Sequence, residues 1–210
     1  TTELADIVTT SIEEAYQKLA HISGEAVFIT DRSYIISGEL LDLQEKILSD
    51  NIEGITTILV DLSGDVVDEE MPFGPLETVW QLDADLATRH MYPAIHPIYS
   101  TSSIMEGTDV DQRHFGLRQR AQKLLRRYRE LRSIVMVHGI QKLPEGEQTT
   151  YDRGERLEAY LTQPFYVAEK FTGPGEVVSI EQTLNDVEAI LEGKQDQESV
   201  EKLKFIGCLS

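Results

Sequence analysis

Two segments of the chain place aromatic side chains beside a proline, an arrangement that can hold a planar ligand. The first is residues 91–97, which read MYPAIHP, and the second is residues 160–173, which read YLTQPFYVAEKFTG. Proline fixes the local backbone, so the neighbouring ring is held in place. Such a ring stacks on a nucleobase without requiring specific hydrogen bonds. The same aromatics also suit a packed core, and the residue types alone leave both interpretations open.

Two aspartates follow short β-rich runs of apolar residues. Residues 26–29 lead to Asp31, and residues 55–60 lead to Asp61. Buried parallel strands read as continuous apolar runs, and open α/β sheets bind ligands at the edge where such strands end. Each aspartate is therefore a candidate ligand contact. The alternative is that each one only caps the turn that follows its strand.

The sequence contains no self-contained catalytic motif. It has no G-x-x-x-x-G-K-[ST] phosphate-binding loop, no nucleophile elbow, and no cysteine and histidine cluster at metal-ligand spacing. The five histidines are scattered along the chain. The single cysteine, Cys208, excludes an internal disulfide and fits a reducing compartment. No catalytic residue is therefore predicted.

The composition excludes some classes of partner. A formal net charge of −18 argues against nucleic acid, because a phosphate-binding surface must be basic. It also argues against unassisted binding to an anionic membrane surface. No apolar run approaches the ~18–20 residues that span a bilayer, so direct membrane insertion is not expected.

The elements that would position the aspartates lie in the first half of the chain. A capping box at Ser11 and Glu14 predicts a helix to about residue 21, and a second helical pattern covers residues 40–48. Together with strands at residues 26–29 and 55–60, this order predicts a parallel sheet with crossover helices. Both aspartates would then lie at the same edge of the sheet.

The second half of the chain has a helical pattern. Apolar residues recur every three or four positions from about residue 109 to Gly139, which predicts one long helix. A second helix is expected to end near residue 161. A third follows the capping box of Ser179 and Gln182 to about residue 191, and a short one covers residues 197–204. The basic outer face of the long helix is predicted to be solvated rather than to bind nucleic acid; it carries Arg118, Arg120, Lys123, Arg126, Arg127, Arg129 and Arg132.

The two aromatic segments resemble the β subunit of F-type ATP synthases. The corresponding motifs of that family read Tyr-Pro-Ala-Val-Asp-Pro and Leu-Ser-Gln-Pro-Phe-x-Val-Ala-Glu-x-Phe-Thr-Gly. Residues 43–47, 54–56, 65–75 and 82–84 are also similar to the family, so the resemblance extends from about residue 24 to the C-terminus. The fold class that it implies is α/β followed by all-α. Residues 1–103 would form a partial P-loop (RecA-like) nucleotide-binding domain with parallel strands, and residues 104–210 a C-terminal helical bundle.

The resemblance also implies a ligand, which is ATP or ADP with Mg²⁺. Family members surround the adenine with three aromatic rings, which correspond to Tyr92, Phe165 and Phe171 here. Asp31 corresponds to the Walker B aspartate, which holds the magnesium through water. Phe115 stands where the family has a tyrosine that faces the nucleotide of the neighbouring α subunit.

The implied partners are the α subunit and the central-stalk γ subunit of a proton-translocating ATP synthase. The family's hairpin that pushes on the rotor lies at residues 141–147, which are Gln141, Lys142, Leu143, Pro144, Glu145, Gly146 and Glu147. The implied location is cytoplasmic, or its matrix or stromal equivalent, and peripheral to a membrane as part of the complex.

The departures from the family concern catalysis. The Walker A loop and the glutamate that orients the attacking water have no counterpart in this sequence, and phosphoryl transfer depends on such positioning and charge stabilisation. Ser103 replaces an arginine, and the hairpin has lost acidic residues and gained Lys142. The sequence therefore predicts a β-like component that is not catalytic alone. The alternative is a stand-alone scaffold or regulatory protein that has lost ATPase activity.

Overall fold

The computed structural model describes residues 14, 17, 23–31, 52–61, 77–103, 110–144, 146–165, 169 and 173–209. The chain forms two compact units, Thr1–Pro75 and Leu76–Ser210. Sequence patterns instead predict a change of domain after residue 103. In the structure, residues 77–103 belong to the same compact unit as the helices that follow them. The two units are described separately below.

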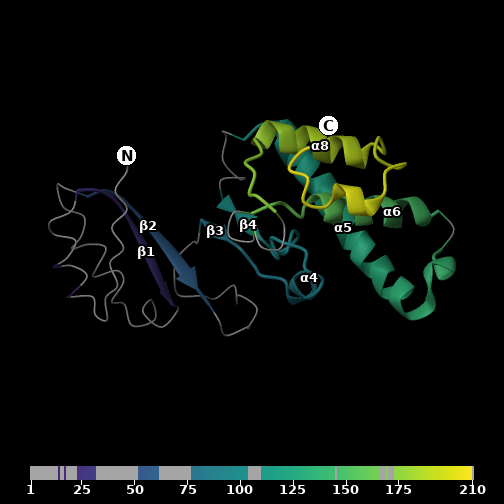
Figure 1. Ribbon diagram of the computed structural model, residues 1–210, viewed down its shortest axis with the longest axis horizontal. Coiled ribbons are helices and arrows are strands. Elements are labelled where there is room, and N and C mark those ends of the chain that lie inside the picture. The colour runs from purple at the N-terminus through teal and green to yellow at the C-terminus, as the bar shows by residue number, and fades with distance from the viewer. Residues whose placement is uncertain are drawn as a thin grey trace. The chain divides into compact units, whose positions relative to one another are not determined.

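The first unit contains a parallel pair of strands, β1 (Gly24–Asp31) and β2 (Ile52–Val60) (Figure 1). The predicted parallel pairing of the two apolar runs is thus observed, and Asp31 lies opposite Val60 at the end of the ladder. Of the helix predicted to begin near Ser11, only Glu14 and Gln17 are described, and both are helical. The helix predicted at residues 40–48 lies outside the described residues. A complete P-loop domain stays a prediction.

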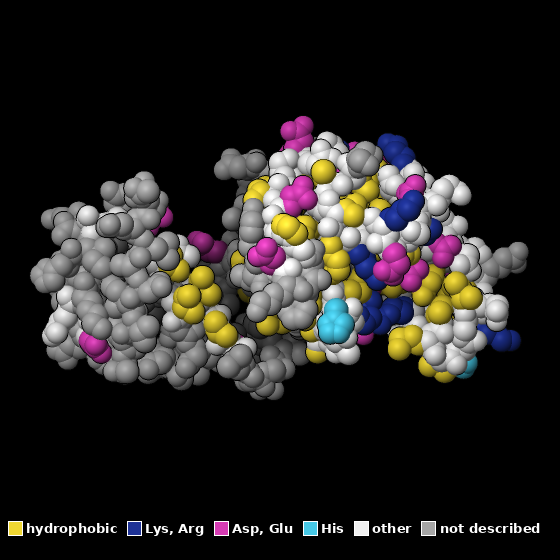
Figure 2. All heavy atoms as spheres, in the orientation of Figure 1, with side chains coloured by type: hydrophobic (Ala, Val, Ile, Leu, Met, Phe, Trp, Pro, Cys, Tyr) yellow, Lys and Arg dark blue, Asp and Glu magenta, His cyan; other side chains and the backbone are white. Residues whose placement is uncertain are grey.

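The apolar runs of the two strands differ from the prediction in their burial. Continuous apolar runs are typical of strands that are covered on both faces. Val27 and Ile29, which alternate along one face of β1, are instead 61% and 71% exposed. Ile58 and Val60 of β2 are also exposed, and apolar side chains form a visible patch over these strands (Figure 2).

The second unit begins with a compact loop region at residues 77–103. Two short antiparallel strands, β3 (Thr78–Val79) and β4 (Thr101–Ser102), pair the first residues of this region with its last residues. Between them lies α4 (Ala84–Thr88), whose first turn is capped by the carboxylate of Asp83. A single bridge joins Leu82 to Ile95 and closes the loop on itself.

The helices of the second unit follow the sequence prediction closely. α5 (Gln112–His138) begins where Asp111 accepts a hydrogen bond from the backbone N–H of Arg113, and it ends at Gly139, whose φ is 84°. A short 3₁₀ helix, η2 (Ile140–Lys142), leads to α6 (Gln148–Tyr160), and α6 packs against α5 (Figure 1). Glycine tolerates the positive φ at residue 139 because it has no Cβ.

The predicted capping box before the third long helix is half formed. α8 (Ile180–Leu191) begins at Ser179, whose hydroxyl accepts from the backbone N–H of Gln182 at 3.2 Å. The side chain of Gln182 does not return the bond to Ser179. It donates to Asp186 at 2.8 Å instead. The short helix predicted at residues 197–204 is the four-residue 3₁₀ helix η4 (Val200–Leu203).

Two apolar clusters hold α5, α6 and α8 together. The larger one joins buried side chains from all three helices and from the loop region; its members are Ile98, Leu125, Leu157, Tyr160, Val187 and Ile190. The smaller one contains Tyr128, Leu131 and Tyr151. The backbone of α6 approaches Tyr128 so closely at Gly154 that a Cβ there would collide with the ring. Among the described residues, no helix combines the length and apolarity needed to cross a bilayer.

Candidate functional site

The Tyr-Pro segment is held in a defined loop by backbone hydrogen bonds. The backbone N–H of Asp83 donates to the carbonyl of Ala94 at 2.8 Å, and that of His96 donates to the carbonyl of Gln81 at 2.7 Å. The peptide bond between Tyr92 and Pro93 is cis. Tyr92 is half-buried at the turn of this loop.

The Gln-Pro-Phe segment lies directly beside Tyr92. The backbone N–H of Gln163 donates to the carbonyl of Tyr92 at 2.8 Å. Two residues further on, Phe165 is 40% exposed, whereas Tyr160 at the start of the same segment is 1% exposed and belongs to the core. The structure therefore brings Tyr92 and Phe165 into one region and gives Tyr160 a packing role. Phe171 lies outside the described residues.

A group of buried charges fixes this loop against α5 and α6. Arg129 of α5 donates to Asp83 at 2.7 Å, and Glu158 of α6, which is 3% exposed, pairs with Arg89 at 2.8 Å. Burial alone would raise the pKa of Asp83, but the hydrogen bonds from Arg129 and from the backbone of α4 outweigh it and lower the pKa. Each carboxylate thus has an arginine partner, as buried charges require.

His96 belongs to the same group in its neutral form. Its Nδ1 faces the backbone N–H groups of Ile98 and Tyr99 at 3.2 Å, and its Nε2 faces a guanidinium nitrogen of Arg129 at 2.7 Å. Burial and the charge of Arg129 both lower the pKa of the ring. A neutral ring accepts through one nitrogen only, so His96 accepts either from these backbone groups or from Arg129, and in both cases it helps to hold the Tyr-Pro loop.

The buried network corrects the prediction that the basic face of α5 is solvated. The side chains of Arg129 and Arg132 are only 22% and 18% exposed, and Arg132 donates to Asp85 at 2.7 Å. Arg127 is also held, by Glu147 at 2.7 Å. The C-terminal part of the basic face thus binds carboxylates from elements far away in sequence. Helical periodicity predicts which residues share one face of the helix, but it does not predict which residues of other elements contact that face.

The other residues named from sequence are spread over the chain. Phe115 lies near the start of α5 and is 45% exposed. Asp31 ends β1, and its side chain is not described. Among the described residues, no three His, Cys, Asp or Glu side chains gather as metal ligands, so magnesium binding rests on the resemblance at Asp31 alone.

The predicted rotor hairpin connects α5 to α6. Its first residues, Gln141 and Lys142, are exposed in η2, and Gly146 adopts a φ of 87° before Glu147. Glu145 lies outside the described residues. Just before the hairpin, Met136 and Val137 at the end of α5 are 73% and 75% exposed. The described part of the hairpin and the end of α5 therefore combine exposed polar residues with exposed apolar side chains.

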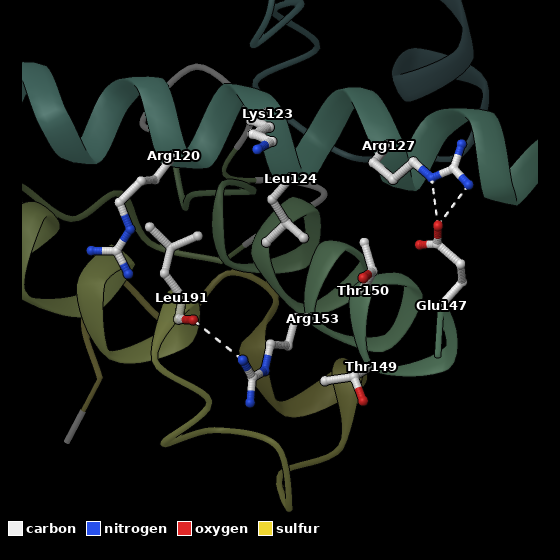
Figure 3. A pocket seen from close by; sticks show the side chains of 9 residues that line it. All are labelled: Arg120, Lys123, Leu124, Arg127, Glu147, Thr149, Thr150, Arg153 and Leu191. Atoms are coloured by element: carbon white, nitrogen blue, oxygen red, sulfur yellow. Dashed lines mark hydrogen bonds and ion pairs between the residues drawn. The ribbon is translucent and has the colours of Figure 1, made fainter. Parts of the chain in front are cut away.

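Sequence reasoning missed a basic pocket of about 410 Å³ between α5 and α6 (Figure 3). Basic side chains enter it from both helices; the full lining is Arg120, Lys123, Leu124, Arg127, Glu147, Thr149, Thr150, Arg153 and Leu191. Spacings of three and four between the basic residues of α5 were visible in the sequence. The facing residues of α6 were not foreseeable, because helix pairing determines them.

Comparison with known proteins relates this fold to ATP synthases. Residues 103–200 match the family described as the C-terminal domain of V and A type ATP synthase. A solved structure with a similar fold is that of a unique ATP synthase subunit, NeqB, from Nanoarcheaum equitans, with a TM-score of 0.57 and 20% sequence identity. The match covers 75% of this chain and 39% of NeqB, so the chain spans about two fifths of that protein.

The chain resembles a subunit of a rotary V- or A-type ATP synthase. The family match lies in the helices α5, α6 and α8, which carry the basic pocket and the hairpin. It agrees with the predicted ATP synthase resemblance at this coarser level. The finer assignment to an F-type β subunit stays a prediction.

Proposed function

We propose that the chain is a β-subunit-like component of a rotary ATP synthase, in the place that the β subunit has in F-type enzymes. In this proposal it contributes an adenine pocket and a rotor-facing helical domain and is not catalytic alone. The observation that carries the proposal is the 2.8 Å hydrogen bond from the backbone N–H of Gln163 to the carbonyl of Tyr92. It joins two segments that lie far apart in sequence and that the resemblance to F-type β subunits assigns to the adenine pocket.

The proposed pocket binds ATP or ADP through its base. Tyr92 is half-buried, and Phe165 keeps 40% of its surface exposed, so each ring has a surface that a base can cover. Phe171 would supply the third ring. Stacking of one base contributes roughly 1–3 kcal/mol. Without a phosphate-binding loop in the chain, affinity is therefore expected to be weak, in the millimolar range.

The proposal also includes magnesium bound beside the phosphates. Asp31, at the carboxyl end of β1, would hold Mg²⁺ through water. The metal would neutralise phosphate charge, and the chain's own part would be to position that metal. No hydrolysis by the chain alone is expected, because the residues that orient water and stabilise the transferred phosphate are not present in it.

The helical domain would supply the contacts to the other subunits. The hairpin at residues 141–147, with the exposed Met136 and Val137 beside it, would contact the central-stalk γ subunit. Phe115, which is 45% exposed, would face the nucleotide of a neighbouring α subunit. The assembled complex would be cytoplasmic, or in the equivalent matrix or stroma, and peripheral to a membrane.

Titration with ATP tests the adenine pocket. We expect weak, saturable binding of ATP and ADP, measured by the chemical shifts of the aromatic side chains, and no phosphate release. Tyr92→Ala should reduce the affinity by about tenfold, because one stacking surface is lost. Tyr99→Ala is the matched control, since Tyr99 is 63% exposed and stacks on His96 rather than lining the proposed pocket. Phosphate release by the purified chain, or binding that is indifferent to Tyr92→Ala, would contradict the proposal.

One observation favours the second candidate, a stand-alone scaffold or regulatory protein. Glu147, an acidic residue of the hairpin, already holds Arg127 at 2.7 Å. That carboxylate is engaged within the chain, so the hairpin presents less negative charge to a rotor. The same titration separates the two candidates, because a scaffold has no reason to bind ATP through Tyr92.

A further inference from the structure

The pocket between α5 and α6 concentrates positive charge in an acidic protein. Of the 19 lysines and arginines in the chain, four line this one pocket: Arg120, Lys123, Arg127 and Arg153. Three of them follow one face of α5, and the fourth, Arg153, comes from α6 and is directed towards the carbonyl of Leu191 (Figure 3). With a net charge of −18 on the whole chain, such a concentration marks a place where an anion is attracted.

Carboxylates of the chain satisfy only part of this charge. Arg127 donates two hydrogen bonds to Glu147, at 2.7 and 3.1 Å, and Arg153 is held by Asp196 at 2.7 Å. Within the described residues, neither Arg120 nor Lys123 has a hydrogen bond or an ion pair within 4.0 Å. The charge of Arg120 lowers the pKa of Glu192, although Lys194 has the larger effect. Two cations thus remain available to a ligand.

The remaining lining of the pocket suits a small ligand with oxygen atoms. Thr149 and Thr150 lie in the first turn of α6, where backbone N–H groups and the helix dipole favour negative charge. Leu124 and Leu191 form the apolar part of the wall. The volume of about 410 Å³ lies within the range of small-molecule sites, about 300–1,000 Å³.

We infer that this pocket binds a compact oligophosphate anion, held by the side chains of Arg120 and Lys123 of α5 on one side and by the first turn of α6 at Thr149 on the other. The donors come from two elements, so the ligand must present negative oxygens in several directions. A phosphate chain does this, whereas a single carboxylate presents two oxygens in one direction. Arginine forks and lysine are the usual protein donors to phosphate oxygens. The site is separate from the proposed adenine pocket.

Isothermal titration of the full chain with inorganic tripolyphosphate tests the inference. We expect saturable binding to one site, weakened by added salt because the contacts are charged. The double variant Arg120→Gln with Lys123→Gln should lower the affinity at least about tenfold. Arg126→Gln is the control: it removes one positive charge, half of what the double variant removes, from an exposed position of α5 outside the pocket lining, and it should leave the affinity within about twofold of the wild type.

The variant Glu147→Gln should instead raise the affinity for tripolyphosphate. It removes a negative charge from the pocket wall and releases one partner of Arg127, so the affinity for tripolyphosphate should rise about threefold. Circular dichroism of each variant checks that the helices are kept. Because tripolyphosphate has no base, Tyr92→Ala should leave its binding unchanged. Failure of this inference is therefore distinguishable from failure of the proposed adenine site.

Three outcomes would overturn the inference. The first is an absence of saturable binding at low salt. The second is a loss in Arg126→Gln as large as that in the double variant, which would indicate a general attraction by α5. The third is tighter binding of an acidic peptide of glutamates than of tripolyphosphate, which would make the pocket a docking site for a protein.

Discussion

At the scale of single residues, buried charges hold the Tyr-Pro loop against the helices. Asp83 caps α4 and also accepts from Arg129, so one carboxylate joins the loop to α5. Arg89 joins the other end of α4 to Glu158 of α6 at 2.8 Å. A buried charge that lost its partner would be strongly destabilising. These contacts, rather than apolar packing alone, therefore determine where Tyr92 stands.

The pH dependence of stability should report on this network through Asp85. Hydrogen bonding by Arg132 lowers the pKa of Asp85 from 3.8 to about 2. Because the folded-state pKa is below the ordinary value, the stabilisation is complete above about pH 4 and is lost as the pH falls through about 2. We expect the free energy of unfolding to fall over this range in urea titrations. Asp85→Asn should be less stable near neutral pH and should show a shallower fall.

Parallel pH profiles for the wild type and Asp85→Asn would contradict this account. They would mean that the ion pairs of Asp85 with Arg89 and Arg132 contribute no net stability. Asp83 is expected to add to the acid sensitivity in both proteins, since its pKa is also lowered. The comparison between the two proteins isolates the contribution of Asp85.

At the scale of elements, the sequence predicted the features that depend on residues within one helical turn, namely where helices begin and end. The limits of α5 and the start of α8 were predictable because caps such as Ser179 and stops such as Gly139 act within one helical turn. The inward direction of Arg129 was not predictable, because its partner Asp83 lies 46 positions away in sequence. Of the candidate site, the segments around Tyr92 and Phe165 were predicted, but their contact follows from tertiary packing. The basic pocket was missed for the same reason.

The packing of α6 on α5 is expected to depend on Gly154. A Cβ at this position would collide with the ring of Tyr128, which is 2% exposed and has no room to move. Gly154→Ala should therefore lower the free energy of unfolding by about 1–3 kcal/mol, as overpacking does. Chemical denaturation followed by circular dichroism measures this.

Gly116→Ala is the matched control for that substitution. Gly116 lies inside α5, and nothing is within 4 Å of an added Cβ. Alanine is the better helix former, so this variant should gain about 0.5–1 kcal/mol. Equal effects at the two positions would show that helix propensity, and not the contact with Tyr128, determines the result.

At the scale of the whole molecule, the chain divides where its contacts are few. The first compact unit ends at Pro75 and the second begins at Leu76, although the sequence changes from mixed to helical patterns near residue 103. The change in secondary-structure pattern and the domain boundary differ here because the loop region at residues 77–103 packs against the helices. It contributes an apolar side chain to their core and polar partners to Arg129. Ile98 belongs to the main apolar cluster, and Asp83 and His96 both contact Arg129.

Two fragments distinguish these boundaries experimentally. A fragment of residues 76–210 keeps both apolar clusters and the partners of Arg129, which are Asp83, Glu158 and His96 among the described residues. It should therefore unfold cooperatively at nearly the same urea concentration as the second unit in the full chain. A fragment of residues 104–210 loses Ile98 from the core and leaves Arg129 without Asp83. It should be less stable by on the order of several kcal/mol, because a cavity and an unpaired charge arise together. Equal stability of the two fragments would instead support a domain boundary at residue 103, and would mean that residues 77–103 rest on the helices without stabilising them.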